Sequence, residues 1–253
     1  MSDKQAVSFV LIHGGSFNSR YWDLVIPLLN GETLAVDLPG RRSKPANINT
    51  VCIQDWVSSV AGEIEEQDLH NIIMVGHSLA GVTMPGVAAA MPERFQHIVY
   101  SSCSVPSEGH KAASFLREDI KEFMQTIEPA VLSGVLNLDQ GIDQSEILNT
   151  AELIGDTPSQ QQLDFVSDPD RRAYPEALRV MFETFSWRGY PEHIPSTYIK
   201  NNGDILVPPE LQDVMIANIS GSPEVIETEY PHCVEVVAPE LVAGILNTIA
   251  ERG

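Results

Sequence analysis

The chain has 253 residues, of which 43% are hydrophobic and 20% are charged. These values fit one globular α/β domain and exclude the disordered, collagen-like and membrane-spanning classes. The formal net charge is −20, because 35 acidic residues face 15 basic ones. A nucleic acid or an anionic membrane would repel this charge, so the composition argues against both as partners. We interpret the charge mainly as a source of solubility.

The cysteines and the N-terminal residues indicate a cytoplasmic protein. Cys52, Cys103 and Cys233 are odd in number and widely spaced, so they offer neither a disulfide framework nor a paired metal-ligand pattern. The apolar run 7–12 is too short for a signal-peptide core or a membrane span, and no small-residue cleavage site follows it. We therefore expect reduced thiols and a cytoplasmic location.

Strands and helices are expected to alternate along the first hundred residues. Buried strands are predicted at residues 7–12, 33–37, 72–75 and 98–100. Helices are predicted from Asn18 or Ser19 to Leu29, from Val51 to Gln67 with Thr50 as its cap, and from Leu79 to Met91 with a kink at Pro85.

The first strand ends in His13-Gly14-Gly15-Ser16. Two glycines directly after a strand allow a backbone N–H to face open space instead of a neighbouring strand. An oxyanion hole requires such a donor.

The run Ile72 to Val75 leads into Gly76-His77-Ser78-Leu79-Ala80-Gly81, where a strand must reverse into a helix. Such a bend strains the backbone and needs small neighbours, which Gly76, Ala80 and Gly81 provide. It would expose the Ser78 Oγ at the carboxyl edge of the sheet, with the N–H of Leu79 facing any developing negative charge. The alternative is a tight turn without chemistry. The strand before Ser78 and the helix after it favour a nucleophile.

Residues 106–193 contain no buried strand run but several helical repeats of apolar residues. We predict an inserted helical cap here, divided into short helices by Pro158, Pro169 and Pro175. Its large apolar side chains either form the core of the cap or face Ser78, and the sequence does not say which do so. The repeating positions are Phe115, Leu116, Ile120, Phe123, Met124, Ala177, Leu178, Met181 and Phe182, with Trp187 beyond them.

The remaining chain returns to alternation. Strands are expected at 197–200 and 225–228, and helices at 208–218 and 239–250. This order predicts a doubly wound, mostly parallel sheet, with residues 1–105 and 194–253 as the core and 106–193 as the cap. Ligands of such sheets bind beyond the carboxyl ends of the strands, where Gly15, Ser78, Asp204 and His232 all fall.

A serine hydroxyl needs a base to accept its proton, and a neutral imidazole serves near neutral pH. The candidates are His13, His70, His77, His97, His110, His193 and His232. His232 follows the last strand and is free to reach over the sheet. His13 belongs to the glycine turn and His77 is expected to point away from Ser78, so we assign both a structural role.

A carboxylate must hold the imidazole in one tautomer. Asp204 lies just past a strand end, in a tight turn after Asn201-Asn202-Gly203, where its other role is to form the turn. Asp37 is the rival, but its Pro39-Gly40 turn suggests a structural use. The chain order Ser78, Asp204, His232 also suits this sheet topology.

These motifs together resemble the α/β-hydrolase superfamily, and within it the small capped esterases that include plant methylesterases, hydroxynitrile lyases and bacterial pyrethroid-type carboxylesterases. The resemblance covers nearly the whole chain except the cap. It rests on His13-Gly14-Gly15, Asp37-Leu38-Pro39-Gly40-Arg41, the Ser78 motif, Pro92-Glu93-Arg94, Val105-Pro106-Ser107-Glu108-Gly109, Asp204, and His232 with Ala238-Pro239-Glu240.

The resemblance implies a catalytic triad of Ser78, His232 and Asp204 and an oxyanion hole formed by the N–H groups of Gly15 and Leu79. Two positions depart from the pattern. Ala80 stands where glycine is commoner, and Cys233 follows His232 where the hydroxynitrile lyases carry a lysine. The second departure argues against the lyase reaction.

The sequence therefore predicts a carboxylesterase that cleaves a small, largely apolar ester through an acyl-enzyme, without metal or organic cofactor. The alternatives are a lactonase or lyase of the same fold, or a ligand receptor with slow turnover. The partner is a small-molecule ester. The ester itself, the residues that bind it and the oligomeric state do not follow from the sequence.

Overall fold

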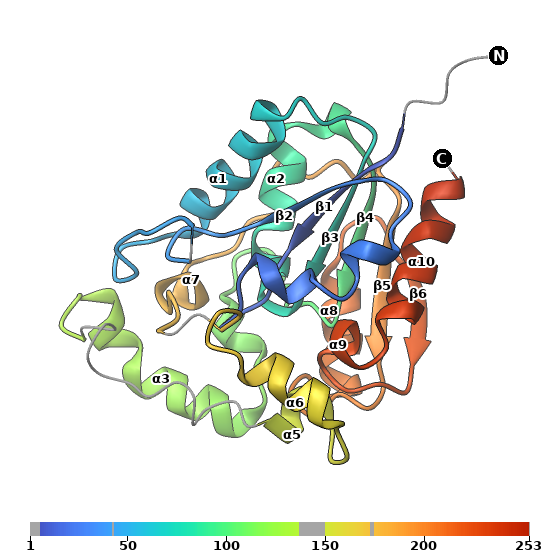
Figure 1. Ribbon diagram of the computed structural model, residues 1–253. Coiled ribbons are helices and arrows are strands. Elements are labelled where there is room, and N and C mark those ends of the chain that lie inside the picture. Colours follow the sequence, from blue (N-terminus) through green and yellow to red (C-terminus); the bar gives the residue numbers. More distant parts are fainter. Residues whose placement is uncertain (1–5, 42, 137–149, 173–174, 253) are drawn as a thin grey trace.

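A six-stranded parallel sheet forms the centre of the computed structural model, which describes residues 6–41, 43–136, 150–172 and 175–252. Its strand order is β2-β1-β3-β4-β5-β6, and every neighbouring pair is parallel. The strands are β1 Ser8–Ile12, β2 Glu32–Val36, β3 Ile72–His77, β4 Phe95–Ser101, β5 Ser196–Asn201 and β6 Glu224–Thr228. The chain winds outward from β1 to β2 and then, from β3 onward, in the other direction, which confirms the predicted doubly wound sheet (Figure 1).

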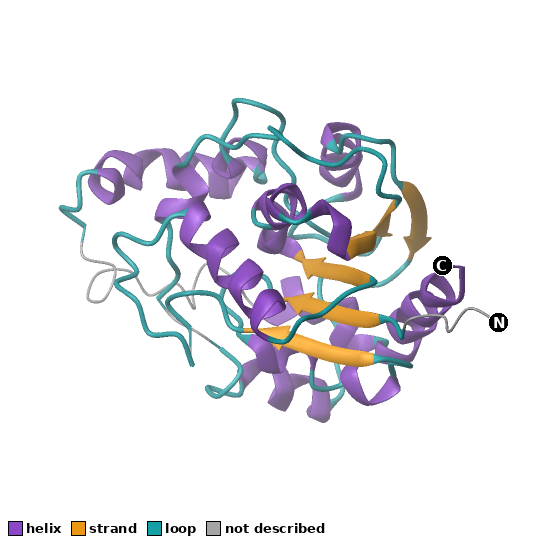
Figure 2. Cartoon of the chain, turned by 90° about the horizontal axis from the view of Figure 1, so that it is seen from above, coloured by secondary structure: helices purple, strands orange, loops and turns teal. Residues whose placement is uncertain are grey.

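Helices cover both faces of this sheet (Figure 2). One face packs against α1 Ile53–Glu66, α2 Met84–Ala90 and α8 Pro209–Asn218, and the other against α9 Val234–Val237 and α10 Pro239–Arg252. Along β1, Val10 and Ile12 enter the first core, whereas Phe9 and Leu11 enter the second. This alternation follows from the two-residue period of a strand. It explains why a strand buried on both faces has no polar interruption.

Three local predictions about helices were wrong. The segment after Asn18 forms two short 3₁₀ turns, η1 Ser19–Trp22 and η2 Ile26–Leu28, instead of one helix. Pro27, which lies in η2, has no N–H to continue a helix through this region. Helix α1 begins at Ile53 after the cap residue Cys52, and not after Thr50, because the Asp55 carboxylate accepts a hydrogen bond from the Cys52 N–H at 2.9 Å.

The third error concerns Pro85. A short helix, η3 Ser78–Val82, ends before a new helix, α2, starts at Met84. Pro85 therefore lies in the first turn of α2, where the missing N–H would have had no partner in the helix, and it does not kink a longer helix.

The described part of residues 106–193 forms helices near the carboxyl ends of the strands (Figure 1). They are η5 Ala112–Phe115, α3 Glu118–Leu132, α5 Thr150–Ile154, α6 Gln160–Ser167 and α7 Arg179–Phe182. Side chains of α3 and α7 join the core on one face of the sheet, and those of α5 and α6 join the core on the other. The division of the chain at residues 106 and 193 stays a prediction.

Three further observations bear on the sequence-based expectations. Cys52, Cys103 and Cys233 are free thiols, and the latter two are buried. Over the described ranges, no helix has the length and hydropathy to cross a membrane. The same ranges contain no group of three or more His, Cys, Asp or Glu side chains placed to hold a metal ion.

Candidate active site

The turn from β3 into η3 is strained and tightly packed around Ser78. Ser78 has φ of +52°, in the left-handed region that a non-glycine residue adopts only when its surroundings hold it there. A Cβ at Gly76 would lie 2.9 Å from the Cβ of Ala80, and a Cβ at Gly81 would lie 2.4 Å from the carbonyl oxygen of Ser104. The strained turn predicted from the small residues is therefore present. Ala80 fits because its neighbour at position 76 has no side chain.

We expect Gly81→Ala to lower the free energy of unfolding by about 2 kcal/mol, because the new methyl group would meet the rigid backbone of Ser104. Urea unfolding measures this change. Gly62→Ala is the matched control, since Gly62 lies inside α1 and no atom lies within 4 Å of its added Cβ. That variant should be up to about 1 kcal/mol more stable than the wild type. Equal effects of the two substitutions would contradict the packing argument.

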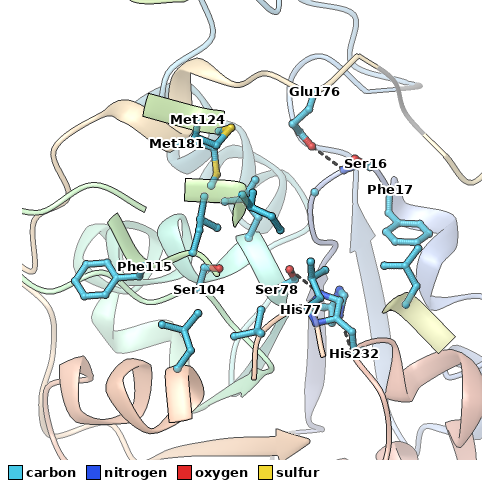
Figure 3. A pocket seen from close by; sticks show the side chains of 18 of the residues that line it. Ser16, Phe17, His77, Ser78, Ser104, Phe115, Met124, Glu176, Met181 and His232 are labelled. Atoms are coloured by element: carbon cyan, nitrogen blue, oxygen red, sulfur yellow. Dashed lines mark hydrogen bonds between the residues drawn. The ribbon is translucent and has the colours of Figure 1, made fainter. Parts of the chain in front are cut away.

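Ser78, His232 and Asp204 meet at the carboxyl edge of the sheet (Figure 3 shows the first two). The His232 Nε2 lies 3.0 Å from the Ser78 Oγ, and its Nδ1 lies 2.7 Å from the Asp204 Oδ2. With the Nδ1–H donated to the carboxylate, the Nε2 is free to accept the hydrogen of the Ser78 hydroxyl. The structure thus brings together three residues that lie far apart in the sequence.

The Asp204 carboxylate is held in place by the turn that follows it. Its Oδ1 accepts hydrogen bonds from the N–H groups of Leu206 at 2.9 Å and Val207 at 2.8 Å. Its Oδ2 is thereby directed to His232, and the residue is only 1% exposed. Turn formation and imidazole binding, which the sequence posed as alternatives for Asp204, are thus both present in the structure.

Asp37, the rival carboxylate, holds two loops instead. Its Oδ1 accepts a hydrogen bond from the Ser19 N–H at 2.7 Å, and its Oδ2 accepts one from the Ser43 N–H at 2.9 Å. Burial raises the pKa of this carboxyl, but the hydrogen bonds from Ser19 and Ser43 outweigh it and lower the pKa to about 2. The side chain is ionised and fully engaged in the structural use that its turn suggested.

His77 contacts His232 through a hydrogen bond and through its ring. Its Nε2 donates a hydrogen bond to the backbone carbonyl of His232 at 3.2 Å, and the two ring centroids are 4.7 Å apart. The Tyr21 ring also stacks on His77, with the ring centroids 4.7 Å apart, and the Tyr21 hydroxyl donates to the buried Glu235 carboxyl at 2.7 Å. His77 lines the same cavity as Ser78, against the expectation that it points away from Ser78, and its hydrogen bond and ring contacts join it to His232 and Tyr21.

His13 holds the glycine turn. Its Nδ1 donates to the Gly14 carbonyl at 2.8 Å and its Nε2 accepts from the Leu38 N–H at 3.2 Å. Burial lowers the pKa of His13 to about 4 and also lowers that of His77 well below its usual range. Both rings are therefore neutral near pH 7.

Burial by itself lowers the pKa of His232, but the charge and hydrogen bond of Asp204 raise it, and the net pKa is above its ordinary value. The imidazolium form is therefore stabilised where a base in an acyl-transfer reaction becomes charged. Of the two histidines at Ser78, only His232 has its imidazolium form stabilised, because burial keeps His77 neutral.

A largely apolar cavity opens over Ser78 (Figure 3). Six of the predicted apolar positions of residues 106–193 line it, namely Phe115, Leu116, Ile120, Met124, Leu178 and Met181. Phe123 and Trp187 are not among the residues that line the cavity. Phe123 is 39% exposed, and Trp187 packs on Phe185 and Tyr190. Gly15 and Leu79, the candidate oxyanion donors, both line it.

Several lining residues were not predicted from the sequence to face the cavity. They are Ser16, Phe17, Ser104, Leu153, Glu176, Leu206, Val207 and Leu211. Leu206 and Val207 could have been proposed from their position directly after Asp204. Glu176 could not, because nothing in the local pattern indicates which acidic residue of the insertion turns inward.

A parallel sheet of this order, with a strained serine at a strand-to-helix turn after β3, is the architecture of the α/β-hydrolases. The sequence model of the alpha/beta hydrolase family matches residues 9–245, and the chain belongs to this family. The family and fold predicted from the motifs are thus confirmed.

Curated relatives are esterases and hydrolases of low identity. A pyrethroid hydrolase of Sphingobium wenxiniae is 23% identical over 96% of this chain and 87% of its own length. A putative chloroplastic methylesterase 11 of Arabidopsis thaliana is 24% identical over 85% of this chain, but the match spans only 57% of that protein.

Solved structures share the fold. An extracellular α/β-hydrolase from a Paenibacillus species has a TM-score of 0.77 at 21% identity, covering 96% of this chain and 98% of its own. Polyneuridine aldehyde esterase has a TM-score of 0.71 at 20% identity, covering 97% of this chain and 100% of its own.

Proposed function

We propose that the protein is a serine hydrolase that cleaves carboxylic esters of small, largely apolar substrates through an acyl-enzyme. The observation that carries this proposal is the chain of contacts from Asp204 through His232 to Ser78, at 2.7 and 3.0 Å, beside an apolar cavity. Ser78 is the nucleophile, His232 the general base and Asp204 the carboxylate that orients the imidazole.

The reaction proceeds in two halves. The Ser78 Oγ attacks the ester carbonyl carbon while the His232 Nε2 takes the hydroxyl proton, and the carbonyl π electrons move to the oxygen. When the carbonyl re-forms, the bond to the alkoxy group breaks and His232 protonates the departing alcohol. Water then attacks the acyl-enzyme by the same route, and the acid is released with Ser78 and His232 restored.

The N–H groups of Gly15 and Leu79 are assigned to the oxyanion hole. Support comes from their place in the same cavity as Ser78, with Leu79 directly after the nucleophile at the start of η3. Donors of this kind stabilise the negative oxygen of the tetrahedral intermediate, and loss of one typically costs about 10²–10³ in kcat.

The substrate is assigned to neutral esters. No lysine or arginine is among the described residues that line the cavity, so a carboxylate on the substrate would lack a counter-ion there. The helices between residues 106 and 193 are assigned as the cap that supplies the apolar wall. The names of the relatives, a pyrethroid hydrolase and a methylesterase among them, favour ester substrates of this kind. The cytoplasmic location remains a prediction.

A panel of esters and lactones tests the proposal. We expect sustained release of p-nitrophenol from neutral acyl esters and stoichiometric labelling of Ser78 by an organophosphonate, located by mass spectrometry. Esters that carry a free carboxylate should have a much lower kcat/KM. One turnover followed by arrest would indicate a receptor instead, and turnover of lactones alone would indicate a lactonase.

The pH profile of kcat/KM should report His232. Only the neutral imidazole accepts the Ser78 proton, so activity falls as the pH falls through the pKa of His232. Because that pKa is raised, the midpoint is expected above the ordinary histidine value of 6.5. In Asp204→Asn the raising interaction is lost, and the midpoint of the residual activity should move down. If the midpoint does not change in this variant, the fall of kcat/KM at low pH cannot be assigned to His232.

A further inference from the structure

Arg41 and Glu176 form a buried ion pair that makes hydrogen bonds to the loop that carries Gly15. The two residues are 2% and 5% exposed, and the Arg41 Nη2 donates to the Glu176 Oε1. The Glu176 Oε2 accepts a hydrogen bond from the Ser16 N–H at 2.6 Å, and the Arg41 Nε donates to the Phe17 carbonyl at 3.0 Å. Together they hold the backbone of two successive residues of this loop.

The loop needs such support. Ser16 has φ of +60°, a left-handed conformation that a residue with a side chain adopts only when its surroundings determine it. The hydrogen bond from its N–H to Glu176 fixes the peptide unit that joins it to Gly15. The direction of this peptide helps to fix where the preceding N–H, that of Gly15, points.

The Glu176 carboxylate also lies close to the reacting centre. A Cβ built on Gly15 would be 3.3 Å from the Glu176 Oε2, and Glu176 lines the same cavity as Ser78. Burial raises the pKa of this carboxyl, but Arg41 and the backbone N–H donors outweigh it, so the group is ionised. An unbalanced negative charge here would oppose the oxyanion of the transition state, and Arg41 balances it.

Resting on the proposed function, we infer that Arg41 and Glu176 are positioning residues for ester hydrolysis. They hold the Gly15–Phe17 loop so that the Gly15 N–H faces the oxyanion, and Arg41 shields the oxyanion from the Glu176 charge. Through this pair, a residue of the segment 106–193 directly sets the geometry of the reacting centre on the sheet.

Arginine is required at position 41 for a geometric reason. Its Nε and Nη2 reach two different acceptors, the Phe17 carbonyl and the Glu176 carboxylate, from one planar group. A lysine offers a single nitrogen and cannot satisfy both in this arrangement. Arg41→Lys should therefore behave as a damaged variant and not as a conservative one.

The test compares Glu176→Gln, Arg41→Met and the double variant with the wild type. We expect kcat to fall about tenfold in Glu176→Gln, less than the loss of a whole oxyanion-hole donor costs, and about a hundredfold in Arg41→Met, where the carboxylate is left without its counter-ion. KM should change by less than about threefold, because the oxyanion forms only in the transition state. The double variant should be more active than Arg41→Met alone, since it removes the unbalanced charge.

The control is Lys111→Met, which breaks the Lys111–Glu128 pair of the same inserted segment at the surface. It should leave kcat and KM unchanged. The double variant also guards against misfolding, because a buried pair replaced by two neutral side chains leaves no unpaired charge. Its thermal unfolding should resemble that of the wild type while its kcat stays low.

Amide hydrogen exchange gives a second readout that does not depend on ester hydrolysis. Peptides that cover residues 13–18 should exchange faster in Glu176→Gln than in the wild type, and Lys111→Met should leave them unchanged. If the wild type cleaves no ester but these peptides respond, the proposed function fails and the loop-holding role stands. Wild-type kcat and wild-type exchange in Glu176→Gln would overturn the inference even if Ser78 proves to be the nucleophile.

Discussion

Ser78→Ala is expected to lower kcat/KM for a p-nitrophenyl ester by about four orders of magnitude or more, to the level left by binding and the oxyanion hole. The substitution removes the only atom that forms the acyl bond. It leaves the cavity and the contact of His232 with Asp204 in place. The free energy of unfolding should fall by about 1 kcal/mol or less, the usual contribution of the one partly buried hydrogen bond that is lost, between the Ser78 Oγ and the His232 Nε2. Initial rates at a range of substrate concentrations, with urea unfolding alongside, measure both quantities.

Ser104→Ala provides the matched comparison, because Ser104 is also a serine that lines the cavity. It makes no covalent bond in the proposed reaction, so we expect kcat/KM to change by less than about tenfold, the effect of one modest binding contact. A similar loss in the two variants would mean that a cavity hydroxyl, and not the nucleophile at the turn, limits the reaction.

Asp204→Asn is the second substitution with a large expected effect. In the wild type, the Asp204 Oδ1 accepts hydrogen bonds from the N–H groups of Leu206 and Val207. The asparagine oxygen would have to take this place, so its NH₂ group would face the His232 Nδ1. The imidazole would then carry its hydrogen on Nε2 and could no longer accept the Ser78 proton. We expect kcat to fall by about 10³–10⁴, the usual result of fixing the wrong tautomer. Steady-state measurements of kcat over about pH 5–9, a range that brackets the ordinary pKa of histidine, test this expectation.

Asp37→Asn separates this effect from a general loss of structure. Asp37 holds the N–H groups of Ser19 and Ser43, so its replacement should destabilise the fold by about 1–2 kcal/mol, as a weakened pair of hydrogen bonds does. Its kcat at a temperature where the variant is folded should stay within about tenfold of the wild type, because no hydrogen bond joins Asp37 to His232 in the described structure. If Asp37→Asn abolished turnover and Asp204→Asn spared it, the two assignments would have to be exchanged.

The sheet and the turn at Ser78 followed from the sequence because their causes are local. A β-branched run buried on both faces, then glycine and alanine around one serine, admits few backbone conformations, and Gly76, Ala80 and Gly81 are each needed for close packing. His232 and Asp204 could be predicted because parallel strands bring their carboxyl ends to one edge, whatever the side chains between them.

The helix errors have a different origin. Residues 18–29 carry apolar side chains at helical spacing, yet the segment forms two short 3₁₀ turns, η1 and η2, and Tyr21, Trp22 and Val25 are still buried. Burial against the sheet decided the backbone there, and periodicity alone does not distinguish an α-helix from consecutive turns that bury the same residues.

Thus the sequence by itself determined the strands, the strained serine and the residues at the strand ends, since each depends on neighbours along the chain or on the geometry of a parallel sheet. Only the tertiary structure decided which apolar residues line the cavity, that Asp37 holds loops, and that Glu176 meets Arg41 and Ser16 across more than a hundred residues. Such contacts depend on how the insertion folds back over the sheet, and no local pattern encodes that direction.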